Sequence, residues 1–404
     1  MAYLPRMKYR RFGRTAIQMP VISCGGMRYQ YKWQDVDPKE VPKENQENLE
    51  ATIRRAVELG INHIETARGY GSSEMQLGNI LPTFPRDKII VQTKVAPHKN
   101  PKDFLKTFQK SLDYLRLDYV DLLALHGVNH RQFLEWSLKK NGCVAAARKL
   151  QRDGLVRHLG FSTHATTDII LDAVNSAEFD YLNVHWYFVN DLNWPAIEAA
   201  GKLDMGVFII SPNDKGGKLY SPPKKLVDLC APLTPMQFND LYCLARKEVH
   251  TLSCGAARPT DFDEHIRALD HYDNIAETIA PVERRLREEM ERTLGADWCR
   301  RWFEGLPHYV DVPGEINVSA AGAMPTTTCG CPSSVIVRPT TFGSPPKRRR
   351  QSASPIIAAS AAPTCSSSPE NPRPASGAMP SAGKTPVLSV PPVSCSASPS
   401  PLRL

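Results

Sequence analysis

Short apolar runs alternate with amphipathic stretches between about residue 20 and residue 272. Several apolar runs, such as Ile89–Val91, are β-branched and apolar at consecutive positions rather than at every second one. Consecutive apolar positions are typical of parallel strands that are covered on both faces. The runs predict eight strands, over Val21–Gly25, Ile61–Thr66, Lys88–Val95, Tyr119–His126, Val156–Phe161, Tyr181–Trp186, Gly206–Ile210 and His250–Cys254.

The stretches between these runs carry the pattern of helices. Leu49 and Ile53 fall on one helical face, and a similar apolar face follows Pro101. Glycines stand where three of the helices would end, at Gly60, Gly154 and Gly201. Eight strand–helix repeats in one direction favour a closed (β/α)8 TIM barrel, and an open doubly wound sheet is the alternative that the pattern leaves.

Two segments lie outside the repeats. Tyr9–Met19 has the pattern of an N-terminal hairpin that turns at Gly13–Arg14 and could plug the bottom of the barrel. Pro281–Arg300 is rich in Glu, Arg and Leu and predicts one more charged helix. We therefore expect a barrel over residues 1–272, an accessory helical extension over 273–318 and a disordered tail over 319–404.

The composition supports this division of the chain. The 404 residues contain 50 Lys+Arg and 42 Asp+Glu, a formal net charge of +8. Residues 319–404 contain eight of these basic residues, one acidic residue and 16 of the 34 prolines, which leaves 42 basic and 41 acidic residues in 1–318. Such a Ser-, Pro- and Ala-rich tail cannot bury enough apolar surface to offset its ordering entropy. The folded part has no charge excess that would predict nucleic-acid binding.

Several other classes of protein are disfavoured. No run approaches the 18 apolar residues of a membrane span, and the first ten residues are not followed by the apolar core of a signal peptide. The ten cysteines lack metal-ligand spacing, so we expect reduced thiols and no metal. We expect a cytoplasmic protein, although the basic cluster Lys347–Arg350 leaves a nuclear location open.

Polar side chains end three successive strands of the predicted barrel. Glu65 ends the second strand, Lys94 lies at the end of the third, and His126 ends the fourth. Tyr70 follows Glu65 after a short loop. Because the C-terminal ends of barrel strands converge on one face, we expect these four side chains to meet.

Their chemistry is that of a proton-donating site. A phenol has a free pKa near 10, and a neighbouring ammonium favours the phenolate and lowers that pKa. A carboxylate keeps the lysine charged and oriented, and a neutral histidine can position a substrate carbonyl. The set suits protonation of a developing alkoxide while a hydride arrives from a cofactor.

Four motifs resemble the aldo-keto reductase superfamily in their order and residue types: Asn62–Gly71 (NHIETARGYG), Val91–Val95, Asp121–His126 and Gly160–His164. The resemblance covers about residues 8–272 and implies a (β/α)8 barrel that binds NADPH without a Rossmann fold. It implies Tyr70 as general acid, Lys94 as its partner, Glu65 as the carboxylate and His126 as the substrate-orienting residue. The region after residue 300 resembles a truncated accessory C-terminal region of one branch, and we expect no iron–sulfur cluster.

The resemblance also implies a cofactor site. Ser162, Thr163 and Asn183 match the positions that bind the nicotinamide amide, and Arg258 favours NADPH over NADH through the 2′-phosphate. The further cofactor positions that the resemblance implies are Gly25, Gly26, Met27, Ser211, Lys215, Gly216, Gly217 and Glu264.

Three departures from the family pattern, and one residue with two possible roles, qualify the implied site. Glu65 replaces the usual aspartate, and Asp261 stands where many members carry a basic residue. Ile210 replaces an aromatic residue that covers the nicotinamide, so Trp186 or Tyr187 would have to cover that face. Arg68, beside the tyrosine, suits either an anionic substrate or a surface ion pair.

Three functions are consistent with these residues. The first is NADPH-dependent reduction of an aldehyde or ketone with Tyr70 as the general acid. The second is a Schiff-base lyase that uses Lys94. The third is a non-catalytic, NADPH-binding regulatory subunit. The small carbonyl substrate cannot be identified, because the loops that would select it carry no motif.

Overall fold

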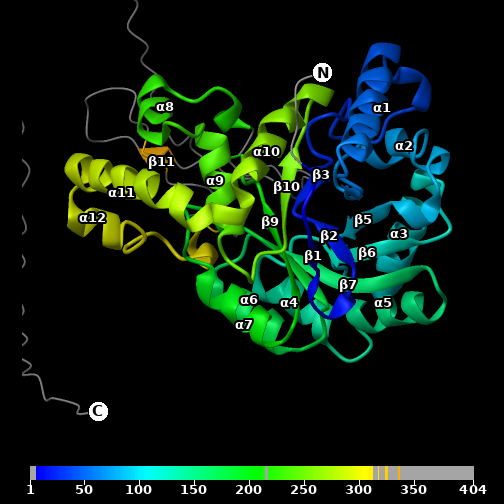
Figure 1. The fold of residues 1–404 in the computed structure, drawn as a ribbon. Coiled ribbons are helices and arrows are strands. Elements are labelled where there is room, and N and C mark those ends of the chain that lie inside the picture. The colour runs from blue at the N-terminus through cyan, green and yellow to red at the C-terminus, as the bar shows by residue number, and fades with distance from the viewer. Residues whose placement is uncertain (1–5, 214–216, 313–316, 318–323, 326–334, 337–404) are drawn as a thin grey trace, which may run out of the picture. The chain divides into compact units, whose positions relative to one another are not determined.

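Eight parallel strands close into a barrel at the centre of the molecule (Figure 1). The computed structural model describes residues 6–213, 217–312, 317, 324–325 and 335–336, all of which lie in one compact unit of the chain. Around the barrel the strand order is β10-β3-β4-β5-β6-β7-β8-β9. The strands are β3 (Ile22–Gly25), β4 (His63–Glu65), β5 (Ile90–Val95), β6 (Val120–Leu125), β7 (Val156–Ser162), β8 (Tyr181–Val184), β9 (Gly206–Ile210) and β10 (Thr251–Gly255). All eight predicted strands and the closed barrel are confirmed, and the open sheet is excluded.

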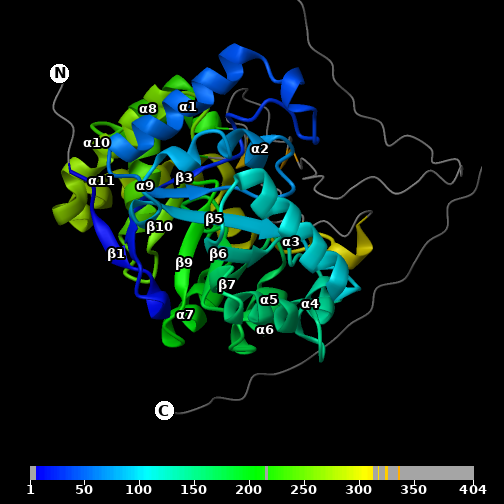
Figure 2. The same ribbon diagram turned by 90° about the vertical axis from the view of Figure 1, so that its right-hand side faces the viewer.

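Helices surround the barrel and cover its outer face (Figures 1 and 2). They are α1 (Lys43–Glu58), α2 (Ser73–Leu77), α3 (Pro101–Leu115), α4 (Arg131–Leu138), α5 (Cys143–Arg152), α6 (Thr167–Asn175), α7 (Trp194–Lys202), α8 (Lys224–Cys230), α9 (Pro235–Leu244) and α10 (Phe262–Ala268). Gly60 and Gly154 follow α1 and α5 with φ of +82° and +79°, as expected of left-handed helix ends. Gly201 instead lies inside α7, and Asp204 takes the positive φ beyond that helix.

An apolar cluster packs inside the barrel, and it includes Phe12 and Met19 of the N-terminal segment. The buried members of the cluster are Phe12, Met19, Ile90, Leu122, Ala124, Tyr181 and Phe208. Two glycines make room for its rings: a Cβ on Gly160 would lie 2.5 Å from the ring of Tyr181, and one on Gly206 would lie 2.6 Å from that of Phe12. The interior is therefore a packed core rather than a channel.

The N-terminal hairpin closes the barrel at the N-terminal ends of its strands. Strands β1 (Tyr9–Arg11) and β2 (Gln18–Pro20) pair antiparallel around the turn Gly13–Thr15. Phe12 enters the barrel and packs against Tyr181, the first residue of β8. The predicted plug is confirmed, and only the opposite end of the barrel is left for a site.

The C-terminal extension contains two helices where the sequence predicted one over Pro281–Arg300. Helix α11 (Ile275–Leu294) starts before Pro281, and Gly295 separates it from α12 (Ala296–Arg301). Gly295 has φ of +86°, a conformation that ends a helix. Strands β11 (Met324–Pro325) and β12 (Val335–Ile336) pair antiparallel, and the rest of the predicted tail lies outside the described residues.

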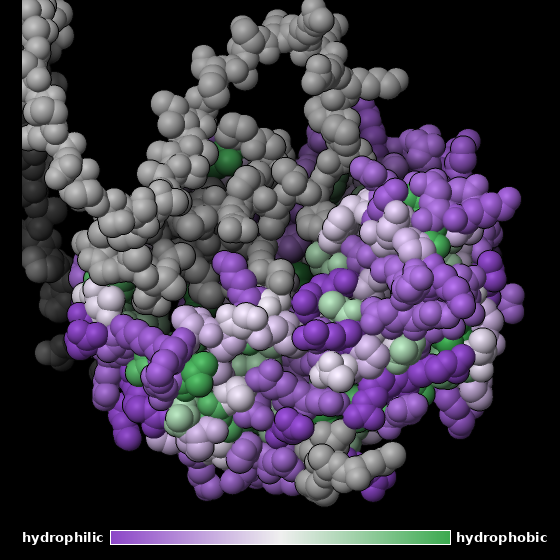
Figure 3. All heavy atoms as spheres, turned by 90° about the horizontal axis from the view of Figure 1, so that it is seen from above, coloured by the Kyte–Doolittle hydropathy of each residue, from purple (hydrophilic) through white to green (hydrophobic). Residues whose placement is uncertain are grey.

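The face seen in Figure 3 is mostly hydrophilic where residues are described, with small and separate apolar patches. Of the helices that the structure describes, none is both long and apolar enough to cross a membrane. The described cysteines, which are Cys24, Cys143, Cys230, Cys243, Cys254 and Cys299, are all free thiols.

Candidate active site

The four side chains that the sequence singled out lie at the C-terminal end of the barrel. Glu65 is the last residue of β4, Lys94 is the penultimate residue of β5, and His126 directly follows β6. Tyr70 lies in the loop between β4 and α2. Parallel pairing of β4, β5 and β6 brings these ends together, as the sequence predicted.

The Lys94 ammonium is the centre of the group. Its Nζ lies 3.1 Å from the Tyr70 hydroxyl and 2.9 Å from the Thr66 carbonyl oxygen, and it forms an ion pair with Glu65 Oε1. An ammonium has three N–H donors, and these three partners use all of them. Lys94 and Glu65 are 1% and 2% exposed, so the pair is shielded from water. The longer glutamate side chain thus reaches the lysine.

Burial governs the acidity of these groups. It raises the pKa of Tyr70 and lowers the pKa of Lys94, and the Glu65 carboxylate opposes the second effect by favouring the ammonium. We expected the ammonium to lower the pKa of the phenol, but desolvation outweighs it in this closed site. The Tyr70 hydroxyl therefore keeps its proton at neutral pH.

His126 stands beside the phenol. Its ring meets the Tyr70 ring edge-on, with centroids 5.6 Å apart. Burial first, and then the charges of Lys94 and His164, lower the pKa of His126 well below its usual value. The imidazole is therefore neutral, and it can hydrogen-bond to a carbonyl oxygen without adding a charge.

Arg68 faces protein carboxylates rather than the mouth of the barrel. It forms ion pairs with the buried Glu74 and with Asp35, and its guanidinium lies over the ring of Tyr114 at 4.7 Å. Its backbone N–H also bonds the Lys94 carbonyl. The ion-pair interpretation of Arg68 thus agrees with the geometry, and the arginine secures the loop that carries Tyr70.

Asn183 has the features expected of a ligand-binding amide. It is fully buried in β8, and neither its Oδ1 nor its Nδ2 has a hydrogen-bond partner among the described residues. Burying both ends of an amide unpaired is costly unless a ligand completes them. Ser162, its neighbour on β7, accepts from the Gly127 N–H, and the Thr163 hydroxyl donates to the Val128 carbonyl. These residues fit a carboxamide.

The glycines at the end of β3, Gly25 and Gly26, pack closely against the candidate site. A Cβ on Gly26 would lie 2.5 Å from the Glu65 carbonyl oxygen, and one on Gly25 would lie 2.6 Å from Ser253 Oγ. Met27, which follows them, is half-buried. Neither position can therefore carry a side chain unless the neighbouring protein atoms move.

The loop after β9 is described in part. Ser211 and Gly217 both have positive φ, of +58° and +73°. Lys215 and Gly216 lie outside the described residues. The prediction that this loop covers a cofactor stays a prediction.

Beyond β10, Arg258 extends toward solvent. Its side chain is 71% exposed, and its Nε donates to Asp261 Oδ1 at 3.0 Å. Glu264 lies three residues after Asp261 and is half-buried in α10. Asp261 therefore orients the guanidinium instead of replacing it.

The structure adds residues that sequence reasoning missed. The Gly255 carbonyl oxygen accepts from Arg28 Nη1 at 2.8 Å, from Asn213 Nδ2 at 3.3 Å and from the Tyr220 hydroxyl at 3.3 Å. Three segments with predicted cofactor residues thus meet at one oxygen. Arg28 could have been found from the sequence, because it directly follows Met27, a predicted cofactor residue. No sequence pattern indicates that Tyr220 contacts Gly255.

Trp186 and Tyr187 are the two alternatives predicted to cover the nicotinamide. Trp186 stacks on Tyr242 of α9 at 5.2 Å and packs against Trp194 of α7. Tyr187 instead contacts His185, which directly follows β8. Because Trp186 is engaged with the outer helices, these contacts favour Tyr187 of the two.

Comparisons with known proteins agree with this geometry. The model of the Aldo/keto reductase family matches residues 21–216. L-galactose dehydrogenase of Arabidopsis thaliana is 29% identical over 318 residues, which cover 69% of this chain and 94% of the relative. L-glyceraldehyde 3-phosphate reductase of Escherichia coli O157:H7 is 22% identical over 340 residues, which cover 70% and 93%.

Solved structures share the fold. An aldo-keto reductase of Bacillus halodurans in its holo form aligns with a TM-score of 0.59 at 19% identity, over 69% of this chain and 96% of that one. An aldo-keto reductase of Klebsiella pneumoniae in complex with NADPH aligns with a TM-score of 0.52 at 16% identity, over 72% and 96%.

Proposed function

We propose, from the premise that this chain is an NAD(P)H-dependent oxidoreductase whose residues 21–216 match the Aldo/keto reductase family, that it reduces an aldehyde or ketone with NADPH, using Tyr70 as the general acid. We assign the barrel to residues 1–272, an accessory helical extension to 273–318 and a separate tail to 319–404.

One observation carries the proposal: the buried Tyr70 hydroxyl lies 3.1 Å from Lys94 Nζ, and Glu65 pairs with the same ammonium. The protonated phenol can donate its proton to a carbonyl oxygen placed between it and His126. As that proton leaves, the ammonium at 3.1 Å stabilises the phenolate that forms. The Glu65 carboxylate keeps Lys94 charged and aimed at the phenol.

His126 orients the carbonyl in this proposal. The neutral ring stands edge-on to Tyr70 and donates a hydrogen bond to the same oxygen. Burial excludes competing water from the proton-transfer path.

The cofactor supplies the hydride when it is bound. Asn183 would hold its carboxamide, because both ends of this buried amide lack partners among the described residues. Gly25 and Gly26 would lie beneath the ring, Ser162 and Thr163 beside it, and Arg258 would bind a 2′-phosphate.

The Schiff-base alternative is disfavoured by the contacts of Lys94. Attack on a carbonyl needs a neutral amine with a free lone pair. Lys94 instead points its three donors at Glu65, Thr66 and Tyr70, which is the arrangement of a held ammonium. Among the residues that the structure describes, no contact favours a purely regulatory role over catalysis.

The test combines cofactor binding with turnover. Quenching of tryptophan fluorescence measures the affinities for NADPH and NADH, and absorbance at 340 nm measures turnover over a panel that starts with trioses and aldoses. Tyr70→Phe should lose at least about 100-fold in kcat, the range of general-acid catalysis, and retain cofactor affinity.

Tyr181→Phe is the matched control. Its buried hydroxyl lies in the apolar cluster inside the barrel with no partner among the described residues, so it should keep full activity. Full activity of Tyr70→Phe would overturn the acid assignment, and tight NADPH binding without turnover on any carbonyl would favour the regulatory subunit.

A further inference from the structure

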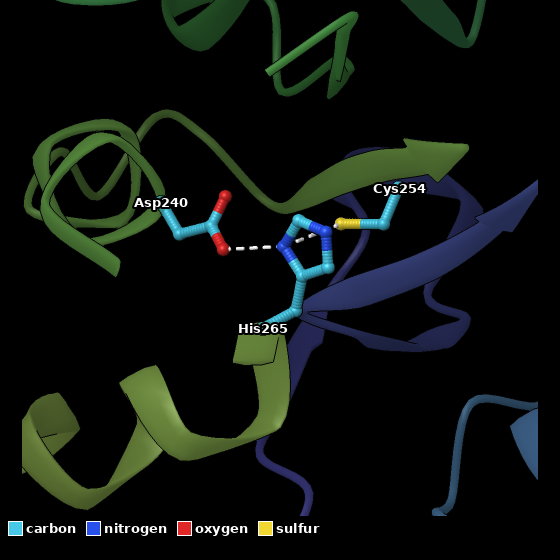
Figure 4. Close-up of side chains that lie close together, drawn as sticks. All are labelled: Asp240, Cys254 and His265. Atoms are coloured by element: carbon cyan, nitrogen blue, oxygen red, sulfur yellow. Dashed lines mark hydrogen bonds and ion pairs between the residues drawn. The ribbon is translucent and has the colours of Figure 1, made fainter. Parts of the chain in front are cut away.

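A second buried polar cluster lies away from the catalytic group, between α9, β10 and α10. It contains Asp240, Cys254 and His265 (Figure 4), whose side chains are fully buried. His265 Nδ1 lies 2.6 Å from Asp240 Oδ2 and 3.4 Å from Cys254 Sγ. Residues of these types can bind a metal, but the direct contact of His265 with Asp240 uses the nitrogen that a metal would need.

The other nitrogen of His265 reaches toward the cofactor segments. Nε2 lies 3.0 Å from the Tyr220 hydroxyl. Tyr220 ends the short turn Lys218–Tyr220, which directly follows Gly217. Arg28, from the loop after β3, lies over the Tyr220 ring at 4.7 Å. The buried pair is thus connected to two segments that we assign to cofactor binding.

The hydrogen bonds of Tyr220 depend on the protonation of His265. The hydroxyl has one proton and two groups that can accept it, the Gly255 carbonyl oxygen at 3.3 Å and His265 Nε2 at 3.0 Å. Asn213 also bonds this hydroxyl, as a donor to its oxygen. If the imidazole is neutral and donates from Nδ1 to Asp240, its Nε2 is an acceptor. The Tyr220 hydroxyl then donates its one proton to Nε2, and it has no proton left to donate to the Gly255 carbonyl oxygen. If the imidazole is doubly protonated, Nε2–H donates to Tyr220, and Tyr220 donates to Gly255. Both contacts are hydrogen bonds only in the second state.

We propose that Asp240 and His265 are positioning residues that control how firmly Tyr220 ties the segment after Gly217 to the end of β10, and thereby control the rate at which the nicotinamide cofactor leaves. The inference rests on the proposed function, because it assigns the segments joined at Gly255 to cofactor binding. The hydrogen bond from Tyr220 to the Gly255 carbonyl oxygen is formed while His265 carries both protons. This hydrogen bond is lost as pH rises and His265 gives up one proton.

The charges around the imidazole favour its protonated state. Asp240 from α9 faces it directly, and Asp261 and Glu264 lie nearby on its own segment. Cys254 from β10 and the Tyr220 phenol are both neutral, because burial raises their pKa values. Burial opposes the charge on His265, but the carboxylates outweigh it and raise the pKa of His265 above its usual 6.5. The change is therefore expected above pH 6.5.

The experiment measures cofactor release by stopped-flow displacement from pH 5.5 to 8.5. NADH is measured beside NADPH because it lacks the 2′-phosphate, and phosphate monoesters titrate near pH 6. In the wild type, the release rate of both cofactors should rise about two- to tenfold as pH rises. This is the change in rate that corresponds to the net free energy of one hydrogen bond. The rate of hydride transfer, measured in a single turnover at saturating cofactor, should not change over the pH range in which the release rate rises.

Three variants separate positioning from general stability. Tyr220→Phe keeps the ring under Arg28, and it should release cofactor fast at low pH with no step. Asp240→Asn removes the facing charge, so the step should move to lower pH. Tyr272→Phe, the control, removes a hydroxyl that bonds Arg10 of the hairpin, and it should behave as the wild type. Circular dichroism confirms folding of each.

The outcomes distinguish this inference from the proposed function. If the wild type binds neither cofactor, the proposed function fails and the inference fails with it. If the wild type binds cofactor but Tyr220→Phe shows the same release rates and the same pH step, the inference alone is overturned. A step of unchanged midpoint in Asp240→Asn would also overturn it.

Discussion

Replacing Lys94 by methionine should destabilise the protein strongly and in a pH-dependent way. The ammonium is the counter-charge of Glu65, which is 2% exposed. The other contacts of Glu65 are two long hydrogen bonds, from the Tyr70 hydroxyl at 3.4 Å and from Ser253 Oγ at 3.3 Å. Two such bonds cannot replace an ion pair, so Lys94→Met leaves a buried charge without compensation. The expected loss is about 3–5 kcal/mol near neutral pH.

The sign of the pH dependence follows from the carboxyl group. In Lys94→Met, burial raises the folded-state pKa of Glu65 above the unfolded value of about 4.3. Below pH 4.3 the group is neutral in both states, and the penalty is small. As pH rises toward the folded-state pKa, the unfolded state ionises first, and stability falls by about 1.4 kcal/mol per pH unit. The wild-type pair should show no such slope.

The assay is urea unfolding, followed by circular dichroism, at pH 5 and pH 8. The matched control is the double variant Glu65→Gln/Lys94→Met, which removes both charges and keeps the shape of the site. It should recover most of the lost stability and lose the extra pH dependence. If the double variant is as unstable as Lys94→Met at both pH values, the cost lies in packing, and the argument from the buried charge is refuted.

Four further changes test separate parts of the structure. Gly160→Ala should cost about 1–3 kcal/mol in urea unfolding, because its Cβ would lie 2.5 Å from the Tyr181 ring. Gly201→Ala, inside α7 and facing only the Glu248 side chain at 3.2 Å, should be neutral or stabilise by up to about 1 kcal/mol, and a loss as large as that of Gly160→Ala would contradict the packing argument. Asn183→Ala should weaken cofactor binding at least tenfold in fluorescence titrations, and unchanged affinity would remove the amide from the proposed site. Arg258→Ala should reduce the preference for NADPH over NADH, and equal affinities in the wild type would remove the phosphate assignment.

The sequence by itself predicted the eight strand–helix repeats and the place of the site. Consecutive apolar residues in several of the runs are typical of strands covered on both faces, and eight repeats in one direction favour a closed barrel over an open doubly wound sheet. Glu65, Lys94 and His126 each end such a run, so the C-terminal ends of the strands bring them together. The sequence also predicted the hairpin, because Gly13–Arg14 has the local pattern of a turn. These features depend on short-range pattern, and short-range pattern is visible in a sequence.

Tertiary structure decided the features that depend on distant contacts. The direction of the pKa shift of Tyr70 depends on how deeply the barrel mouth buries it, and no motif contains that depth. Trp186 packs against Trp194 of α7 and Tyr242 of α9, and its own segment of the sequence does not predict these contacts. The link from Asp240 through His265 to Tyr220 joins residues that lie 25 and 45 positions from the histidine in the sequence. Such a link exists only after the chain has closed on itself, because the free energy of a hydrogen bond depends on burial and geometry that sequence spacing does not encode.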